Sequence, residues 1–189
     1  MNISIVMAYF NRKELLYNTM KSIEHYWPQG DHNEIIVVDD ASDDGNDIAE
    51  LKDVFNLDIK IISIKREEKI WINPCIPFNI GFSKAKNDII IIQNPECIHH
   101  GNIIKYTLNN IKENTYLNYA CYSIDKRSTE RISYVDSNSQ DFMRSVSEIV
   151  YPLVDSRVPY NGTNGWYNHS VHKPHQLHFC SAIMRKDLY

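Results

Sequence analysis

One short stretch of the chain, from Glu34 to Gly45, constrains the fold more than any other. Residues 35–38 are all β-branched, which indicates a buried strand. The chain then carries four aspartates within residues 39–44, together with a serine. Open α/β folds bind their ligands where the parallel strands end. The stretch therefore predicts a polar-ligand site at the carboxyl edge of a sheet, and a nucleotide is the first ligand to consider.

Apolar runs of strand length alternate with segments of helical periodicity along the chain. We expect strands at residues 3–7, 35–38, 59–64, 89–92, 119–124 and 177–184. We expect helices at residues 12–26, 48–54, 77–86, 103–111 and 142–150. This alternation predicts one α/β domain over residues 1–189, a Rossmann-like three-layer α/β/α sandwich with a mostly parallel central sheet.

Three segments between these elements carry local signals. Asn11 and Glu14 have the spacing of a capping box, in which Asn11 accepts from the first helical turn and Glu14 reaches back. The charged run 65–69 is expected to be a solvated loop. Residues 152–174 are rich in Asn, Gly, Tyr and His and show no period. Because a loop of that length is unusual in a compact domain, we expect it to be functional.

Composition and charge exclude several classes of protein. The formal net charge of −4 argues against a nucleic-acid partner, which a basic face would normally bind. No apolar run reaches the length that spans a membrane. The four cysteines are far apart and form no Cys-x-x-Cys pair, which favours reduced thiols and a cytoplasmic location. The oligomeric state is left open.

Four segments in order carry a family resemblance. They are Ile3-Ser-Ile-Val-Met-Ala-Tyr-Phe-Asn-Arg12, Ile36-Val-Val-Asp-Asp-Ala-Ser42, Asn73-Pro-Cys-Ile-Pro-Phe-Asn-Ile-Gly-Phe82 and Asn87-Asp-Ile-Ile-Ile-Ile-Gln-Asn-Pro-Glu96. Together they resemble a family 2 glycosyltransferase with the GT-A fold, over nearly the whole chain. The chain also lacks Gly-x-Gly-x-x-Gly after its first strand and a Walker lysine motif, so other doubly wound nucleotide binders fit less well.

The resemblance implies a nucleotide-sugar site. The residues at matching positions are Ala8, Tyr9, Asn11, Asp39, Asp40, Asn79, Gln93 and Asn94. Asp40 would accept a hydrogen bond from the uracil ring of a UDP-sugar, with Asp39 beside it. Structural alternatives stay open, because Asp39 and Asp40 could cap the turn, Tyr9 could pack at the rim, and Asn79 could bond within its helix. Gly81 is expected to serve close packing of a helix on the sheet.

The segment from Gln93 to Glu96 departs from the family pattern. The family places two aspartates here to hold a divalent metal ion, but this chain has a proline and a single carboxylate, Glu96. Glu96 is the candidate metal ligand, supported by amide oxygens of Gln93 or Asn94. Oxygen ligands would favour Mn²⁺ or Mg²⁺. Weak metal binding, metal-independent transfer and absence of chemistry remain alternatives.

The acceptor side is expected in the polar segment near the C-terminus. Trp166 and His169 are the candidate acceptor-binding residues, because an aromatic face stacks well on a sugar ring. Histidines recur every three residues at His169, His172, His175 and His178, and neutral imidazoles can build a zinc site. Pro174 interrupts this series and the step fits neither a helix face nor a strand face, so zinc is disfavoured.

The resemblance also implies a reaction. It would be an inverting transfer of a sugar, of the hexosyl type, from a UDP-sugar to a carbohydrate or other hydroxyl acceptor. The catalytic base usually follows the segment that matches Ser181–Tyr189, so we assign no catalytic residue and expect a domain truncated at its C-terminal end. The alternative is a non-catalytic nucleotide-sugar or carbohydrate-binding domain, or an inactive fragment of a larger transferase.

Overall fold

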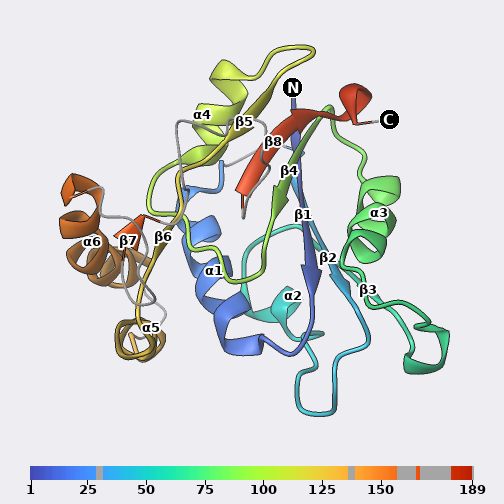
Figure 1. Ribbon diagram of the computed structural model, residues 1–189, viewed down its shortest axis with the longest axis horizontal. Helices are drawn as coiled ribbons and strands as arrows, with labels where there is room; N and C mark the ends of the chain where they lie inside the picture. The colour runs from blue at the N-terminus through green and yellow to red at the C-terminus, as the bar shows by residue number, and fades with distance from the viewer. Residues whose placement is uncertain (29–31, 136–138, 157–164, 167–179, 189) are drawn as a thin grey trace.

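A six-stranded sheet forms the centre of the computed structural model, which describes residues 1–28, 32–135, 139–156, 165–166 and 180–188 (Figure 1). The strands are β1 (Ile3–Tyr9), β2 (Glu34–Asp39), β3 (Ile59–Ser63), β4 (Ile89–Gln93), β5 (Tyr116–Asn118) and β8 (Cys180–Met184). Their order across the sheet is β3-β2-β1-β4-β8-β5. Strands β1 to β4 are parallel, and β8 is antiparallel to both of its neighbours. The predicted mostly parallel sheet is therefore confirmed.

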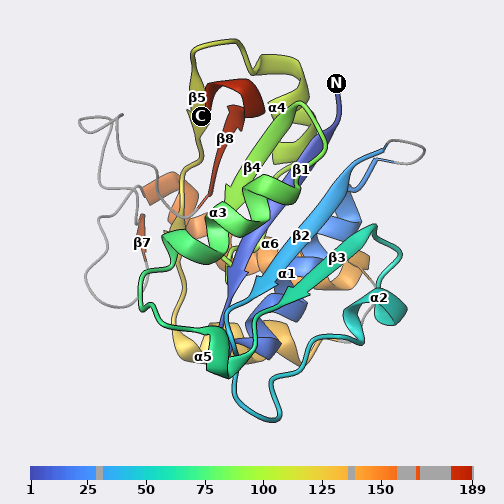
Figure 2. The same cartoon turned by 90° about the vertical axis from the view of Figure 1, so that its right-hand side faces the viewer.

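Helices cover both faces of this sheet (Figures 1 and 2). They are α1 (Lys13–Tyr26), α2 (Leu51–Val54), α3 (Cys75–Lys84), α4 (Ile103–Asn110), α5 (Lys126–Ser133) and α6 (Ser139–Ser156), with short 3₁₀ turns η1 (Arg66–Glu68) and η2 (Arg185–Asp187). Helices α1, α2 and α4 pack on one face and α3 packs on the other. The three-layer arrangement expected from the sequence is confirmed.

The two faces arise from the alternation of side chains along each strand. In β1, Ile5 and Met7 join the core beneath α1, whereas Val6 joins the core beneath α3. Gly81 lets α3 approach the sheet closely, because a Cβ atom there would lie 2.4 Å from Cγ1 of Val6. The expected packing role of Gly81 is therefore confirmed, and a larger side chain would push α3 away from the sheet.

Helices α5 and α6 build a separate apolar cluster outside the three layers. Ile132 of α5 packs with Phe142, Val146 and Val150 of α6, and these helices contact α1. Lys21 of α1 lies 5.3 Å from the centre of the Phe142 ring. The sequence analysis missed α5, because its residues are largely charged and its apolar face is narrow. Asp125 caps α5 by accepting from the backbone N–H of Ser128.

Several predicted boundaries were wrong. Of the strand expected at residues 119–124, only β6 (Tyr122–Ser123) forms, and it pairs with β7 (Gly165–Trp166), whereas the sheet strand β5 ends just before this range. The helix expected at 48–54 begins only at Leu51, and the one expected at 142–150 extends over 139–156 with Pro152 inside it. Propensity over a short window does not decide which partner a strand finds, so tertiary pairing set these limits.

No helix within the described ranges is both long enough and apolar enough to cross a bilayer.

Candidate functional site

The carboxyl ends of three neighbouring strands lie side by side. Tyr9 at the end of β1 is in register with Asp39 of β2, which is in register with Ser63 of β3. The backbone N–H of Asp40 donates to the carbonyl of Tyr9 at 2.8 Å, so the pairing continues one residue beyond β2. The acidic turn, residues 39–44, therefore leaves the sheet at its carboxyl edge beside the end of β1, as predicted.

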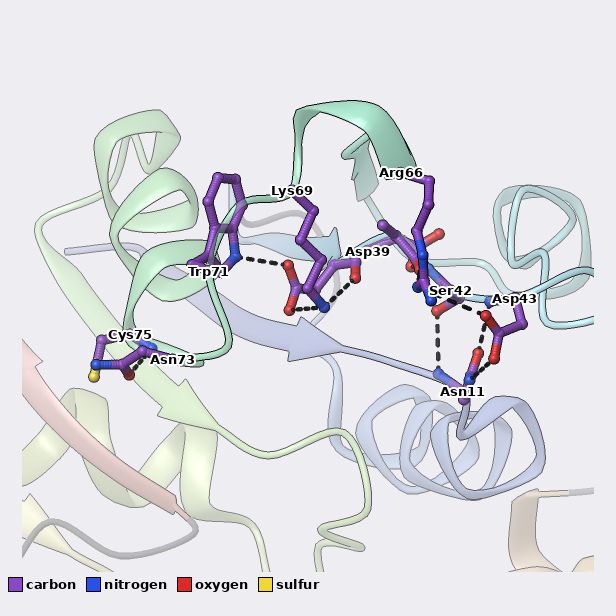
Figure 3. A network of polar contacts seen from close by, with 11 residues as sticks. Asn11, Asp39, Ser42, Asp43, Arg66, Lys69, Trp71, Asn73 and Cys75 are labelled. Carbon is purple, nitrogen blue, oxygen red and sulfur yellow. Dashed lines mark hydrogen bonds and ion pairs between the residues drawn. The ribbon is translucent and has the colours of Figure 1, made fainter.

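Asn11 ties the acidic turn to the end of β1. Its side-chain amide donates to Oδ2 of Asp43 at 2.6 Å and accepts from the backbone N–H of Asp43 at 2.8 Å. Its backbone N–H donates to Oγ of Ser42 at 3.1 Å (Figure 3). The predicted capping box was wrong. Asn11 has a left-handed φ of 51°, and α1 starts at Lys13 without a side-chain cap, because the Asn11 amide is committed to the turn.

The two aspartates that follow β2 have different surroundings. Asp39 is half-buried, and its Oδ1 accepts from the backbone N–H of Ser42 at 3.0 Å, which is a turn-capping contact. Asp40 is 7% exposed. Burial of a carboxylate requires compensating donors, and Asp40 has them in a segment far away in the sequence.

Lys69 and Trp71 hold the carboxylate of Asp40. The Lys69 ammonium lies 2.8 Å from Oδ2 and 2.9 Å from the Asp40 carbonyl oxygen. The Trp71 indole N–H donates to Oδ1 at 2.9 Å (Figure 3). Lys69 also lies 4.5 Å from the centre of the Phe10 ring, a cation–π contact. An ion pair and a hydrogen bond therefore converge on one carboxylate at the sheet edge, and the cation–π contact positions the ammonium.

The run 65–69 was predicted to be a solvated loop, which is confirmed for the exposed residues 65–68 and wrong for Lys69. Arg66 donates to the carbonyl of Ala41 at 2.9 Å and lies 3.6 Å from Asp43, while Lys69 is largely buried. One signal was available, because four clustered aspartates need cations nearby, and Arg66 and Lys69 follow the next strand. The sequence could not show that this loop folds back over the turn.

Other predicted nucleotide-sugar residues are spread around this edge. Ala8 is half-buried at the end of β1. The Tyr9 ring is fully buried rather than at the rim, and its hydroxyl donates to the carbonyl of Asn46 at 2.9 Å. Burial raises the pKa of the Tyr9 hydroxyl to about 12. Asn79 is exposed on α3.

A second group of polar side chains follows β4. Gln93 is fully buried; its Nε2 donates to the carbonyl of Cys97 at 2.8 Å, and its Oε1 lies 2.7 Å from Nε2 of His99. Because Oε1 can only accept, His99 carries its proton on Nε2. Burial lowers the pKa of His99 to about 3, so the ring is neutral at ordinary pH. Both ends of the Gln93 amide are therefore committed, and Asn94 beside it is half-buried.

Glu96 faces a cation rather than a cluster of metal ligands. Its Oε1 lies 2.5 Å from Nη1 of Arg12, and the two side chains are 26% and 52% exposed. No group of three or more His, Cys, Asp or Glu side chains with metal-binding geometry occurs among the residues that the structure describes. As placed, Glu96 and the committed amide of Gln93 do not fit a divalent metal ion.

Of the two predicted acceptor residues, only Trp166 lies within the described part of the chain. Trp166 belongs to β7 and its backbone pairs with Tyr122 of β6. His169 lies outside the described residues, as do His172, His175 and His178. The acceptor site and the disfavoured zinc site therefore remain predictions.

Comparison with solved structures defines the class of fold. Mannosyltransferase PcManGT from Pyrobaculum calidifontis, in complex with GDP-Man and Mn²⁺, superposes with a TM-score of 0.58 at 16% identity, covering 97% of this chain and 44% of that one. Glucosyl-3-phosphoglycerate synthase from Mycobacterium tuberculosis, in complex with UDP, gives 0.51 at 13% identity, covering 98% and 57%. The fold is thus the GT-A fold of glycosyltransferases.

The family follows from the sequence. The model of glycosyl transferase family 2 matches residues 4–188, so the chain belongs to that family. TarS from S. aureus in complex with UDP-GlcNAc gives a TM-score of 0.50 at 16% identity, covering 58% of this chain and 30% of that one. No curated protein matches the sequence. The chain spans about half the length, or less, of these solved relatives.

Proposed function

We propose that this chain is the nucleotide-sugar domain of a glycosyltransferase that transfers a sugar from a UDP-sugar to a hydroxyl acceptor. The observation that carries the proposal is the buried Asp40 carboxylate at the carboxyl end of β2, held by Lys69 and Trp71. Family membership supports the proposal, as do the UDP and UDP-GlcNAc in the complexes of two solved relatives.

Asp40 retains hydrogen-bonding capacity for a base. Each carboxylate oxygen can accept two hydrogen bonds, and Lys69 and Trp71 take one on each oxygen. The imide N–H of uracil would donate a further hydrogen bond to one of these oxygens. Lys69 supplies the counter-charge that makes burial of an ionised carboxylate tolerable, and Trp71 fixes its orientation. A fixed acceptor costs less to order on binding than a mobile one.

The remaining candidates divide by exposure. Ala8 and Asn94 are half-buried at the edge, and Asn79 is exposed on α3, so their side chains can reach a ligand. The Asn11 amide is bound to Asp43, so we assign Asn11 the task of holding the turn. Asp39 accepts from the backbone N–H of Ser42, so we assign it the task of shaping the turn next to the ligand. Tyr9 and Gln93 are fully buried, so we assign them the task of positioning the backbone of β1 and β4.

A divalent ion, Mn²⁺ or Mg²⁺, enters the proposal through Glu96. Mn²⁺ accompanies the donor in the PcManGT complex. Metal binding here requires Glu96 to exchange Arg12 for the ion.

We infer an inverting, hexosyl-type transfer, with Trp166 and His169 on the acceptor side. None of the described cysteines forms a disulfide, which suits a reducing compartment, and we infer the cytoplasm.

A second candidate function is a non-catalytic nucleotide-sugar or carbohydrate-binding domain. The Arg12–Glu96 ion pair favours it, because the only carboxylate in that segment is already neutralised. The two candidates differ in a measurable way. A transferase releases UDP from a UDP-sugar when acceptor is present, whereas a binding domain binds the donor and releases nothing.

Calorimetric titration of UDP and of GDP, each with Mn²⁺ or with EDTA, tests the donor site. We expect UDP to bind, Asp40→Asn to weaken binding at least tenfold, and Asp53→Ala to leave it unchanged, since Asp53 is exposed on α2 away from the edge. Guanine also presents N–H donors, so tighter binding of GDP would replace UDP by GDP in the proposal. Failure of both nucleotides to bind, in both conditions, would refute it.

A further inference from the structure

A cavity of about 530 Å³ lies beyond the end of β4, on the side of the sheet that α1 covers. Its wall is built from the segment after β4, from the chain between β5 and α5, and from one face each of α1, α5 and α6. Cavities of about 300–1,000 Å³ are the usual size for small-molecule ligands. The third apolar cluster, which the three-layer fold does not need, forms part of this wall through Ile132, Val146 and Val150.

The wall is mostly apolar. Its apolar members among the described residues include Leu15, Ile98, Ile103, Ile124, Ile132 and Val146. Neither lysine nor arginine occurs among the lining residues that the structure describes, and the one carboxylate among them, Glu96, is already paired with Arg12. An anionic headgroup would therefore meet no counter-charge from the described lining of this cavity.

Two residues of the wall hold acceptor atoms without a partner. Oε2 of Glu96 and Nδ1 of His99 are buried and unbonded, and both residues line the cavity. Nδ1 is a bare acceptor because the neutral ring carries its proton on Nε2, toward Gln93. Buried acceptors without donors are rare in folded proteins, because they lose their hydrogen bonds to water. Both unused groups are acceptors, so the missing partner is a hydrogen-bond donor.

We propose that this cavity binds the acceptor of the transfer, a neutral hydroxyl compound with an apolar ring or chain. The apolar part fills the cavity, and a hydroxyl donates to the Glu96 carboxylate. The Glu96 side chain is 26% exposed, and rotation of its carboxylate brings Oε2 to the ligand. That the ligand is the acceptor of the transfer rests on the proposed function, whereas the chemistry of the ligand rests on the cavity alone.

Three probes separate the elements of this proposal. Phenyl β-glucoside carries both a ring and hydroxyls, glucose lacks the ring, and phenyl phosphate exchanges the hydroxyls for negative charge. In calorimetric titrations we expect phenyl β-glucoside to bind at least tenfold more tightly than either of the other two. Equal or tighter binding of phenyl phosphate would overturn the neutral-ligand assignment, and equal binding of glucose would overturn the apolar part.

Variants tie the binding to the cavity. Ser123→Phe fills the cavity from a half-buried position on β6 and should abolish binding of phenyl β-glucoside while UDP still binds. Glu96→Gln should weaken binding of phenyl β-glucoside at least fivefold. Glu14→Gln, on the exposed face of α1, is the matched control and should change nothing. Binding that survives both Ser123→Phe and Glu96→Gln would place the probe elsewhere and overturn the proposal.

The native thiols supply a second readout. Cys97 and Cys121 line the cavity, whereas Cys75 is exposed at the start of α3 and lies outside it. Bound phenyl β-glucoside should slow alkylation of the two cavity thiols at least threefold and leave Cys75 unchanged. UDP binding without probe binding would overturn this inference and spare the proposed function. Probe binding without nucleotide binding would support the ligand chemistry and refute the transferase.

Discussion

Two regions at one edge of the sheet differ in whether their buried hydrogen-bond acceptors have donors. In the acidic turn, the Asp40 carboxylate receives an ammonium from Lys69 and an indole N–H from Trp71. In the cavity after β4, one acceptor atom of Glu96 and one of His99 receive nothing. The Asp40 side chain and the two acceptor atoms without a partner are all buried, so the difference lies in what the fold brings to each.

The difference indicates how each region can bind a ligand. The Asp40 carboxylate is paired with Lys69 before any ligand arrives, so under the proposed function it would offer a nucleotide base a fixed acceptor at little reorganisation cost. The cavity is apolar and lacks donors for its acceptors, so it gains most from a ligand that supplies a hydroxyl. We therefore infer that the turn recognises the donor and the cavity the acceptor.

Removal of the Asp40 carboxylate should have the largest effect. Asp40→Ala leaves the Lys69 ammonium, which is 16% exposed, without its carboxylate. Breaking a buried pair from one side typically costs about 3 kcal/mol, so we expect the free energy of unfolding to fall by about that amount in urea denaturation. Asp53→Ala is the exposed control. If both variants unfold alike, the turn is not held by charge balance and the comparison fails.

Acid should destabilise the cavity side through His99. Burial lowers the pKa of His99 from 6.5 to about 3, so the unfolded chain takes up this proton more readily than the folded chain. The contribution of His99 to stability is therefore complete above pH 6.5 and is lost as the pH falls toward 3. We expect a loss of about 2 kcal/mol between pH 6.5 and 4.5, measured by urea denaturation.

The variant His99→Gln isolates this effect, because glutamine does not titrate. The difference in unfolding free energy between wild type and His99→Gln should shrink as the pH falls, whereas His32→Gln, at an exposed histidine, should track the wild type. A difference that does not depend on pH would mean that His99 is not held neutral by burial.

A smaller effect is expected when Trp71 loses its donor. Trp71→Phe keeps an aromatic ring but removes the hydrogen bond to Oδ1 of Asp40. We expect a loss of about 1 kcal/mol in unfolding free energy, by urea denaturation, and UDP affinity a few-fold lower by calorimetry, because the carboxylate is less well oriented. Unchanged UDP affinity would show that Lys69 alone orients Asp40.

The smallest effect is expected at the Arg12–Glu96 pair. Its side chains are 52% and 26% exposed, so water and salt screen the pair. Arg12→Gln should change the unfolding free energy by no more than about 0.5 kcal/mol in urea denaturation, and the change should diminish in high salt. A loss as large as that of Asp40→Ala would make the cavity side as charge-dependent as the turn and remove the contrast between them.

Much of the fold was predictable because its signals are local. The β-branched run before Asp39, the apolar strand β4 and the periodicity of α1 each express a preference within one segment. Gly81 was also predictable, since a glycine in a helix that packs on a sheet marks close approach. The position of Asp40 at the carboxyl edge followed from the alternation of strands and helices.

The partners of these residues depended on tertiary structure. Asn11 had the spacing of a helix cap, but its amide binds the acidic turn. Lys69 belonged to a run that resembled a solvated loop, yet it neutralises Asp40. Glu96 was the candidate metal ligand, and the fold placed Arg12 against it.

The sequence by itself therefore determined the strands β1 to β4 and β8, the α/β class, the family resemblance and the edge at which the acidic side chains gather. Only the tertiary structure decided which of those side chains are neutralised, which remain without a donor, and where a cavity is left. The physical reason is range. Periodicity and propensity act over a few neighbouring residues, whereas charge pairing and cavity formation depend on segments that meet only when the chain has folded.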